Sequence, residues 1–225
     1  GSSGGTLAGR VKSSFEPVPD QRRTRVGLAG LGTVGLGVFR WLQSLAGDFE
    51  LTGILVGGSE KVRPEDVPRR LIITSWEDLL ESDPDLIVEV IGGTGTAAQL
   101  INGARERGIP VITANKEFLA GRLDLLEDDS LVSGSASVGG SVPALETVDD
   151  LVSEEVISLS GIINGTCNFI LDRMDQGSTQ SEALAEAQLK GLAEADPTMD
   201  ISGRDCVHKL ALLATRAFGV AVTTD

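Results

Sequence analysis

The chain has 225 residues, 41% of them hydrophobic, and its 33 acidic and 19 basic residues give a formal net charge of −14 at pH 7. This length and hydrophobic fraction are sufficient for one or two folded domains, and no apolar run approaches the roughly 18 residues that span a bilayer. Because the acidic excess repels nucleic-acid phosphates and anionic lipids, we expect no nucleic-acid partner and no membrane partner.

The first 24 residues are expected to lie outside the fold. Residues 1–5, with the sequence GSSGG, resemble an expression remnant, and the polar stretch that follows to Gln21 shows no hydrophobic period. We therefore interpret residues 1–24 as a tag and a disordered leader, and we expect the first domain to begin at Arg25.

From Arg25 onward, short apolar runs alternate with helical spacings. The runs rich in Val, Ile and Leu predict strands at Val26–Ala29, Leu51–Val56, Leu71–Ile73, Leu86–Ile91 and Ile109–Thr113. Such continuous runs are typical of parallel strands that are buried on both faces. Helical spacings lie between them, from Val34 to Leu45 and again from Leu100 to Ala104. The pattern predicts a Rossmann-type, doubly wound parallel sheet over residues 25–127.

A glycine-rich turn, GLGTVG, follows the first predicted strand. Its position between a strand and a helix is the context in which this spacing indicates a dinucleotide site. Gly30 permits a tight turn, Gly32 lets the backbone approach a pyrophosphate, and Gly35 lets the helix pack closely on the strand. The helix N-terminus at Thr33 and Val34 offers free N–H groups to the anion. The alternative is a glycine-rich turn without a ligand.

The end of the second predicted strand indicates which dinucleotide binds. An acidic residue there holds the ribose 2′-hydroxyl of NAD, whereas basic residues hold the 2′-phosphate of NADP. Here Lys61 and Arg63 follow the strand, and the nearest carboxylate, Glu60, comes one position late. We therefore expect NADP to be preferred and NAD to be possible. Alternatively, the two basic residues are solvated loop charges.

Two later segments follow strands and are expected at the same sheet edge. Gly93 and Thr94 come after the fourth strand, and Asn115 and Lys116 come after the fifth. Ligands of open α/β sheets collect at this carboxyl edge, so we expect all four residues to contact the cofactor. Lys116 could also neutralise a substrate anion or donate a proton. The alternative is a surface lysine that follows an asparagine helix cap.

After residue 127 the pattern changes to that of an α+β domain, predicted to span residues 128–225 and to serve substrate binding and dimerisation. The spacing predicts strands at Leu131–Ser137 and Glu155–Ile163 and helices at Val142–Leu151, Cys167–Met174, Glu182–Leu189 and Ser202–Phe218. Cys167 and Cys206 are too few and too far apart in sequence for a disulfide framework. We expect two buried thiols in a reducing cytosol.

Acidic residues gather before and inside the last predicted helix. Glu194 and Asp200 precede it, and Asp205 and Lys209 lie four positions apart and so share one helical face. One interpretation is a helical ion pair. The other is a site in which carboxylates bind a substrate ammonium and a lysine handles a proton. His208 lies on a different face, where a structural role is expected.

Six segments, in order, resemble the homoserine dehydrogenase family from Arg25 to the end of the chain. They are GLGTVG, EVIGG at residues 89–93, TANKEFLA at 113–120, ASVGGSVP at 136–143, GIINGTCNFIL at 161–171, and LAEADPTMDISGRDCVHKLALLA. The resemblance implies a cytoplasmic homodimer that reduces L-aspartate 4-semialdehyde to L-homoserine with NADPH or NADH, in the pathway to threonine and methionine.

The resemblance also implies roles for individual residues. Lys209 is similar to the lysine that gives its proton to the forming alkoxide, and Asp205 shares its pocket. Glu194 and Asp200 are similar to the family's substrate residues. Lys116 is similar to the residue between cofactor and substrate.

The sequence departs from the family at two places. The family's cation loop usually begins with a glutamate and an aromatic residue before ASVGG, where this chain has Ser135 and Gly134. A hydroxyl is a poorer ligand for a monovalent cation than a carboxylate, so the metal site is doubtful. Only the backbone carbonyls of Val138, Gly140 and Val142 could contribute.

The second departure is length. Family members continue beyond the FGVAV segment, so the catalytic domain of this chain is expected to be incomplete.

Two other functions stay open beside the implied reduction of L-aspartate 4-semialdehyde. One is that of a non-catalytic, dinucleotide-binding regulatory homologue, and the other is that of a dehydrogenase for a related amino-acid aldehyde.

Overall fold

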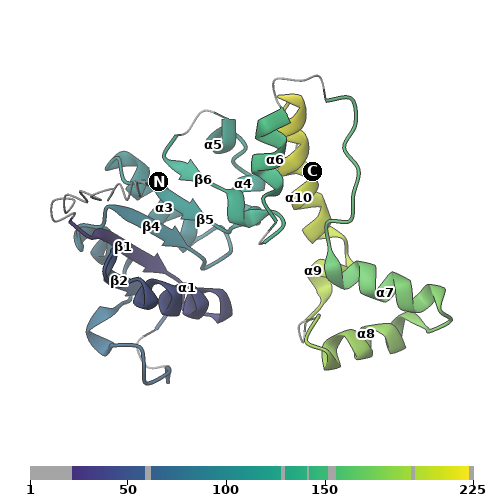
Figure 1. Ribbon diagram of the computed structural model, residues 1–225, viewed down its shortest axis with the longest axis horizontal. Helices are drawn as coiled ribbons and strands as arrows, with labels where there is room; N and C mark the ends of the chain where they lie inside the picture. The colour runs from purple at the N-terminus through teal and green to yellow at the C-terminus, as the bar shows by residue number, and fades with distance from the viewer. Residues whose placement is uncertain are drawn as a thin grey trace, which may run out of the picture.

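The computed structural model describes residues 22–58, 62–127, 130–140, 142–151, 156–193 and 196–222. Residues 1–21 of the predicted leader lie outside these ranges. The described chain forms a parallel sheet flanked by helices, followed by a part built mainly from helices (Figure 1). Among the described residues, no helix combines the length and the apolar character that a bilayer span requires.

Six parallel strands form one sheet in the order β3-β2-β1-β4-β5-β6. The strands are β1 (Thr24–Ala29), β2 (Phe49–Leu55), β3 (Ile72–Ile73), β4 (Leu86–Glu89), β5 (Val111–Thr113) and β6 (Val132–Ser133). The order reverses between β1 and β4, and in open α/β sheets a ligand crevice lies outside the carboxyl ends of the strands at such a reversal. The predicted doubly wound parallel sheet is confirmed.

Ten helices are described, and they cover both faces of the sheet before continuing into the second part of the chain. They are α1 (Thr33–Ser44), α2 (Trp76–Glu81), α3 (Thr96–Glu106), α4 (Lys116–Ala120), α5 (Asp124–Glu127), α6 (Ala144–Leu151), α7 (Gly165–Asp175), α8 (Gln180–Leu189), α9 (Thr198–Ile201) and α10 (Arg204–Phe218), with 3₁₀ turns at Arg69–Leu71 and Ser135–Ser137.

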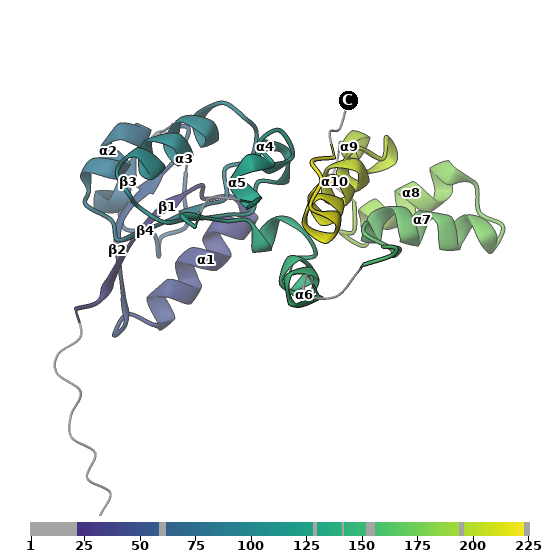
Figure 2. The same ribbon diagram turned by 90° about the horizontal axis from the view of Figure 1, so that it is seen from above.

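Helices cover both faces of the sheet (Figure 2), and each face has a separate hydrophobic core. Phe39 of α1 packs with Leu28 and Ile54 on one face. Ile87 packs with Leu100 of α3 on the other face. Successive strand residues point to opposite faces, and both faces are covered, which explains why the strands appear in the sequence as continuous apolar runs.

Helix α10 joins the second part of the chain to the sheet, because it packs against both α4 and α6. Beyond it, α7 and α8 pack on each other as a hairpin that stands away from the sheet (Figures 1 and 2). The hairpin has a small core of its own around Ile170, Ala183 and Ala187. A capping box formed by Thr179 and Glu182 opens α8.

The two strands predicted for the second domain are the main correction. The run Leu131–Ser137 contributes only β6, which pairs with β5 and extends the first sheet past the boundary predicted at residue 128. Residues 156–163 of the run Glu155–Ile163 form no strand, and residue 155 lies outside the described ranges. A strand needs a neighbour for its backbone N–H and C=O groups. The described chain supplies none here, and Ile157 is 89% exposed.

Candidate active site

The glycine-rich turn has the geometry that requires glycine. Gly30 adopts a φ of +106°, and a Cβ atom there would lie 2.7 Å from the carbonyl oxygen of Val90. A Cβ atom on Gly35 would lie 2.1 Å from the carbonyl oxygen of Gly30, whereas the space around Gly32 is open. The turn therefore lets α1 pack closely on β1 and leaves room for a ligand at Gly32.

A cavity of about 600 Å³ lies beside this turn, and residues that follow β1, β2 and β4 line it. Gly32 begins α1 without a side-chain cap, so no side chain of the described residues competes for the first N–H groups of this helix. Arg63 also lines the cavity, and its guanidinium donates to the backbone oxygen of Gly58. Glu60 and Lys61 lie outside the described residues. The turn, helix end and arginine fit a phosphate-containing dinucleotide.

Asn115 links the turn after β4 to the start of α4. Its Oδ1 accepts a hydrogen bond from the backbone N–H of Phe118 at 3.0 Å, which is the helix-cap alternative of the sequence analysis. Its Nδ2 donates to the backbone oxygen of Gly93 at 2.6 Å. The amide is therefore engaged within the protein, and its direct contact with a cofactor stays a prediction.

Three charged side chains, one from α4 and two from α10, meet where these helices pack together. The Nζ atom of Lys116, at the start of α4, lies 2.6 Å from Oδ1 of Asp205 on α10. The Nζ atom of Lys209, one turn later on α10, lies 2.8 Å from Oδ2 of the same carboxylate and donates to the backbone oxygen of Ile163 at 2.9 Å. The exposed fraction is 34% for the side chain of Lys116 and 18% for that of Lys209, so both retain some access to solvent.

Asn164 completes this cluster, and the sequence analysis missed it. Its Nδ2 donates to Asp200 and to Asp205, each at 2.8 Å. Its Oδ1 accepts from the backbone N–H of Cys167 at 2.7 Å and so caps α7. An asparagine three positions before the predicted helix Cys167–Met174 was the available signal. The predicted substrate residue Glu194 lies outside the described residues.

The electrostatics of the cluster keep Asp205 ionised. Burial alone would raise the pKa of this carboxyl group, but hydrogen bonds from Lys116, Lys209 and Asn164 outweigh it and lower the pKa to about 2. Asp205 pairs with both lysine ammonium groups, whereas the second carboxylate, Asp200, is held by Asn164. Such a site can stabilise a developing negative charge.

The two cysteines were predicted to be buried, yet both are partly exposed, and they lie near this cluster as free thiols. Sγ of Cys167 donates to the backbone oxygen of Asp200 at 3.1 Å. Burial raises the pKa of the Cys167 thiol, and the neighbouring Cys206, Asp200 and Asp205 raise it further. Helices α7 and α10 both contact α9, which brings the two thiols together.

The loop that resembles a cation site offers few ligands. Ser135 donates a hydrogen bond to the carboxylate of Glu146, and the carbonyl of Val142 accepts one from Ala144 at 2.8 Å. No group of three His, Cys, Asp or Glu side chains in the described chain could hold a metal ion. The donor set does not fit a tightly held cation, and the contribution of Val138, Gly140 and Val142 stays a prediction.

Comparison with known families gives two matches along the chain. The family model for the NAD-binding domain of homoserine dehydrogenase matches residues 30–135. The homoserine dehydrogenase model matches residues 143–225. The homoserine dehydrogenase of Bacillus subtilis is 37% identical over 217 residues, which cover 89% of this chain and 50% of that protein. That of Pseudomonas aeruginosa is 39% identical over 215 residues, with 89% and 50% covered.

Solved structures agree with these matches. A homoserine dehydrogenase from Thiobacillus denitrificans has a TM-score of 0.76 at 34% identity, covering 90% of this chain and 51% of that one. The Staphylococcus aureus enzyme at pH 7.5 gives 0.73 at 33%, covering 90% and 53%. A hyperthermophilic archaeal homoserine dehydrogenase in complex with NADPH shares the fold, with a TM-score of 0.74 at 22% identity, covering 89% and 71%. The chain spans about half the length of the curated relatives it matches.

Proposed function

The chain belongs to the homoserine dehydrogenase family, and on this premise we propose that it reduces L-aspartate 4-semialdehyde to L-homoserine with a nicotinamide cofactor. The observation that carries the proposal is the ion-paired cluster of Lys116, Asp205 and Lys209, which α4 holds next to the turn after β4. A dinucleotide-binding module alone does not need two lysines on one buried carboxylate.

The residues of the first domain provide a place for the cofactor. The glycine-rich turn would hold the pyrophosphate through backbone N–H groups, with Gly30, Gly32, Thr33, Val34 and Gly35 as its contacts. Gly93 and Thr94, together with Asn115 and Lys116, would border the nicotinamide end. When bound, the nicotinamide supplies the hydride that reduces the aldehyde carbon.

Lys209 gives its proton to the aldehyde oxygen as negative charge develops there. Its ammonium group is held by Asp205 and by the backbone oxygen of Ile163, so its direction is fixed before substrate arrives. Lys116 contributes a second positive charge near the same oxygen. Because Asp205 has a pKa of about 2, it stays ionised and keeps both lysines in place at neutral pH.

The substrate also carries an α-ammonium group, which needs negative charge. Asp200 supplies a carboxylate beside the cluster, oriented by Nδ2 of Asn164. Glu194 is proposed as a second carboxylate on the strength of the family resemblance.

We propose NADP as the preferred cofactor, because Arg63 lies in the cavity after β2, where a 2′-phosphate would lie. NAD stays the alternative. From the family we also propose a role in threonine and methionine biosynthesis, a cytoplasmic location, and a homodimer, which light scattering tests.

One assay tests the proposed function. NADPH absorbance is followed with L-aspartate 4-semialdehyde in one direction, and NADP⁺ reduction with L-homoserine in the other. We expect turnover in both directions. If NADPH binds and neither substrate reacts, a non-catalytic dinucleotide-binding homologue is supported instead. Reaction with a different amino-acid aldehyde alone would identify a related dehydrogenase.

A further inference from the structure

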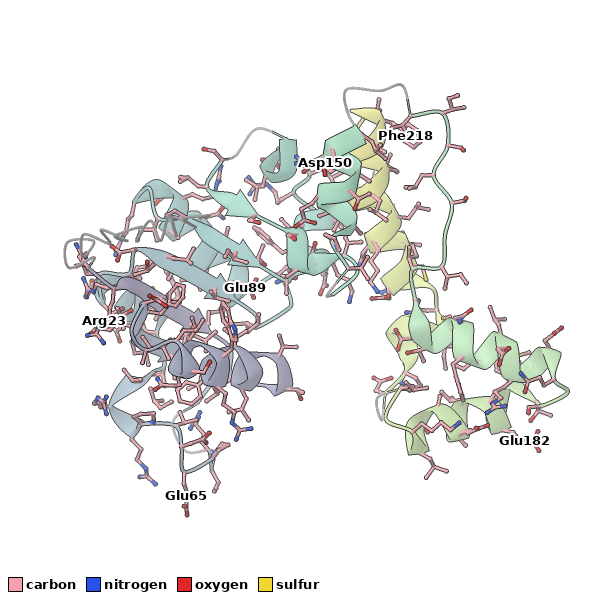
Figure 3. The ribbon with its side chains drawn as sticks, viewed as in Figure 1. Arg23, Glu65, Glu89, Asp150, Glu182 and Phe218 are labelled. Atoms are coloured by element: carbon pink, nitrogen blue, oxygen red, sulfur yellow. The ribbon has the colours of Figure 1, made fainter. Side chains whose placement is uncertain are left out.

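A carboxylate with no role in the mechanism above is enclosed at the end of β4. Glu89 is 0% exposed, and it lies at the edge of the sheet that faces α6 and α10 (Figure 3). Among the described residues, no Lys, Arg or His forms an ion pair with it. A buried charge without a counter-ion is costly unless hydrogen bonds satisfy it, so its hydrogen-bond partners indicate what the residue does.

One oxygen of Glu89 holds the turn that follows its own strand. Oε1 accepts from the backbone N–H groups of Ile91 at 2.8 Å and of Gly92 at 3.2 Å. Gly92 and Gly93 both adopt positive φ values, +80° and +68°, and a Cβ atom at either would meet nothing within 4 Å. Two consecutive left-handed glycines have much conformational freedom to lose. The carboxylate therefore fixes a turn that its own sequence leaves flexible.

The other oxygen of Glu89 holds the neighbouring strand. Thr113 lies opposite Glu89 in the β4–β5 pair, and its hydroxyl donates to Oε2. The same hydroxyl oxygen accepts from the backbone N–H of Asn115 at 3.0 Å. Because Asn115 also donates to Gly93 and caps α4, the hydrogen bonds form a closed ring from Glu89 through β5 and back to the turn.

We propose that Glu89 is a positioning residue, which holds the Ile91–Gly93 turn and the start of α4 in one fixed register. Ile91 lines the dinucleotide cavity, and Lys116 is the first residue of α4. The ring thus sets the cofactor wall and a catalytic lysine relative to each other. The part of this inference that concerns catalysis rests on the proposed function, whereas the fixed register does not.

The test uses Thr113, because the hydroxyl can be removed without changing the size of the side chain. Thr113→Val leaves Oε2 of Glu89 and the N–H of Asn115 without their partner. Thr113→Ser keeps the hydroxyl and is the matched control. Glu89→Gln is a second variant, in which an amide nitrogen in place of Oε2 cannot accept the hydrogen bond that the Thr113 hydroxyl donates.

Hydrogen exchange of the backbone amides is the first readout, and it needs no cofactor. In Thr113→Val and Glu89→Gln we expect exchange at residues 91–93 and 115–118 to accelerate about tenfold or more, with β1 and α1 unchanged. Thr113→Ser should stay within about twofold of the unchanged protein. Ile87→Val, a buried change on the same strand, controls for general loosening of the sheet.

Cofactor binding and kinetics are the second readout. We expect the dissociation constant of NADPH to rise about tenfold in Thr113→Val, and kcat to fall about tenfold while KM for the aldehyde changes less than about threefold. Unchanged exchange at both segments, or acceleration spread over the sheet as in Ile87→Val, would overturn the proposal. If the unchanged chain turns over no aldehyde, the proposed function fails, and exchange alone still decides the role of Glu89.

Discussion

Two opposing effects act on the pKa of the Asp205 carboxyl group, because burial raises it and the pairing with two lysines lowers it. Its pKa is about 2 in the folded chain, against an ordinary value of 3.8. The folded state therefore favours the ionised form. The stability that this provides is complete above about pH 4 and is lost as the pH falls towards 2.

The lowered pKa of Asp205 gives a prediction for the variant Asp205→Asn. The free energy of unfolding of the unchanged chain should fall between pH 5 and pH 2 by about 2 kcal/mol more than that of the variant, because only the former must protonate this carboxylate. Denaturant unfolding across this pH range measures the difference. Equal pH dependence in the two proteins would mean that Asp205 is not held ionised by its lysines.

Arg63 is the residue on which the cofactor preference depends. Arg63→Ala should raise the dissociation constant of NADPH about tenfold or more and leave that of NADH within about twofold, because only NADPH carries the 2′-phosphate. Titration of each cofactor against tryptophan fluorescence measures this. Arg69→Ala is the control, since this arginine does not line the cavity. An equal loss for both cofactors would remove the argument for NADP.

At the scale of elements, Asn164 ties the start of α7 to the cluster of Lys116, Asp205 and Lys209. Helix α8 has a cap of the same kind at Thr179. Substitution of either cap residue by alanine should lower the free energy of unfolding by about 1 kcal/mol. Only Asn164→Ala should also reduce turnover, because it removes one hydrogen bond from Asp200 and one from Asp205. Thermal unfolding and kcat, measured on both variants, separate the two effects, and a parallel loss of kcat in Thr179→Ala would contradict this role.

The elements differ in how well the sequence predicts them, for physical reasons. The strands of the sheet are buried on both faces, and so their apolar runs identify them directly. Helix α2 was missed because six residues are too short to show a helical period. The apolar run Glu155–Ile163, before α7, has the pattern typical of a strand, but residues 156–163 have no partner strand in the described chain.

The sequence predicted those contacts of the site that lie within one segment, but not those that join distant segments. Asp205 and Lys209 lie one turn apart on α10, so their pairing follows from spacing alone. The contact of Lys116 with Asp205 depends on α10 packing against α4, which spacing cannot reveal. Asn164 and Glu89 were missed because their role lies in which distant groups they join.

At the scale of the whole molecule, the carboxyl edge of the sheet and helix α10 meet at α4. The carboxyl edge of the sheet presents the glycine-rich turn, the Ile91–Gly93 turn and the start of α4 on one side. On the other side, α10 packs against α4 (Figure 1), and its Asp205 pairs with Lys116 at the start of α4 and with Lys209. In the proposed reaction the first part of the chain would hold the hydride-carrying cofactor and α10 would supply the proton, so both parts would be needed.

The most direct test of this account compares turnover of L-aspartate 4-semialdehyde with NADPH in the unchanged chain, in Lys209→Ala and in Lys190→Ala. Lys190 lies at the end of α8 and pairs with Glu186, away from the cluster. General acid catalysis contributes about 100-fold or more, so kcat should fall by at least that factor in Lys209→Ala and stay unchanged in Lys190→Ala. Turnover that survives in Lys209→Ala would contradict the assignment of Lys209 as the proton donor.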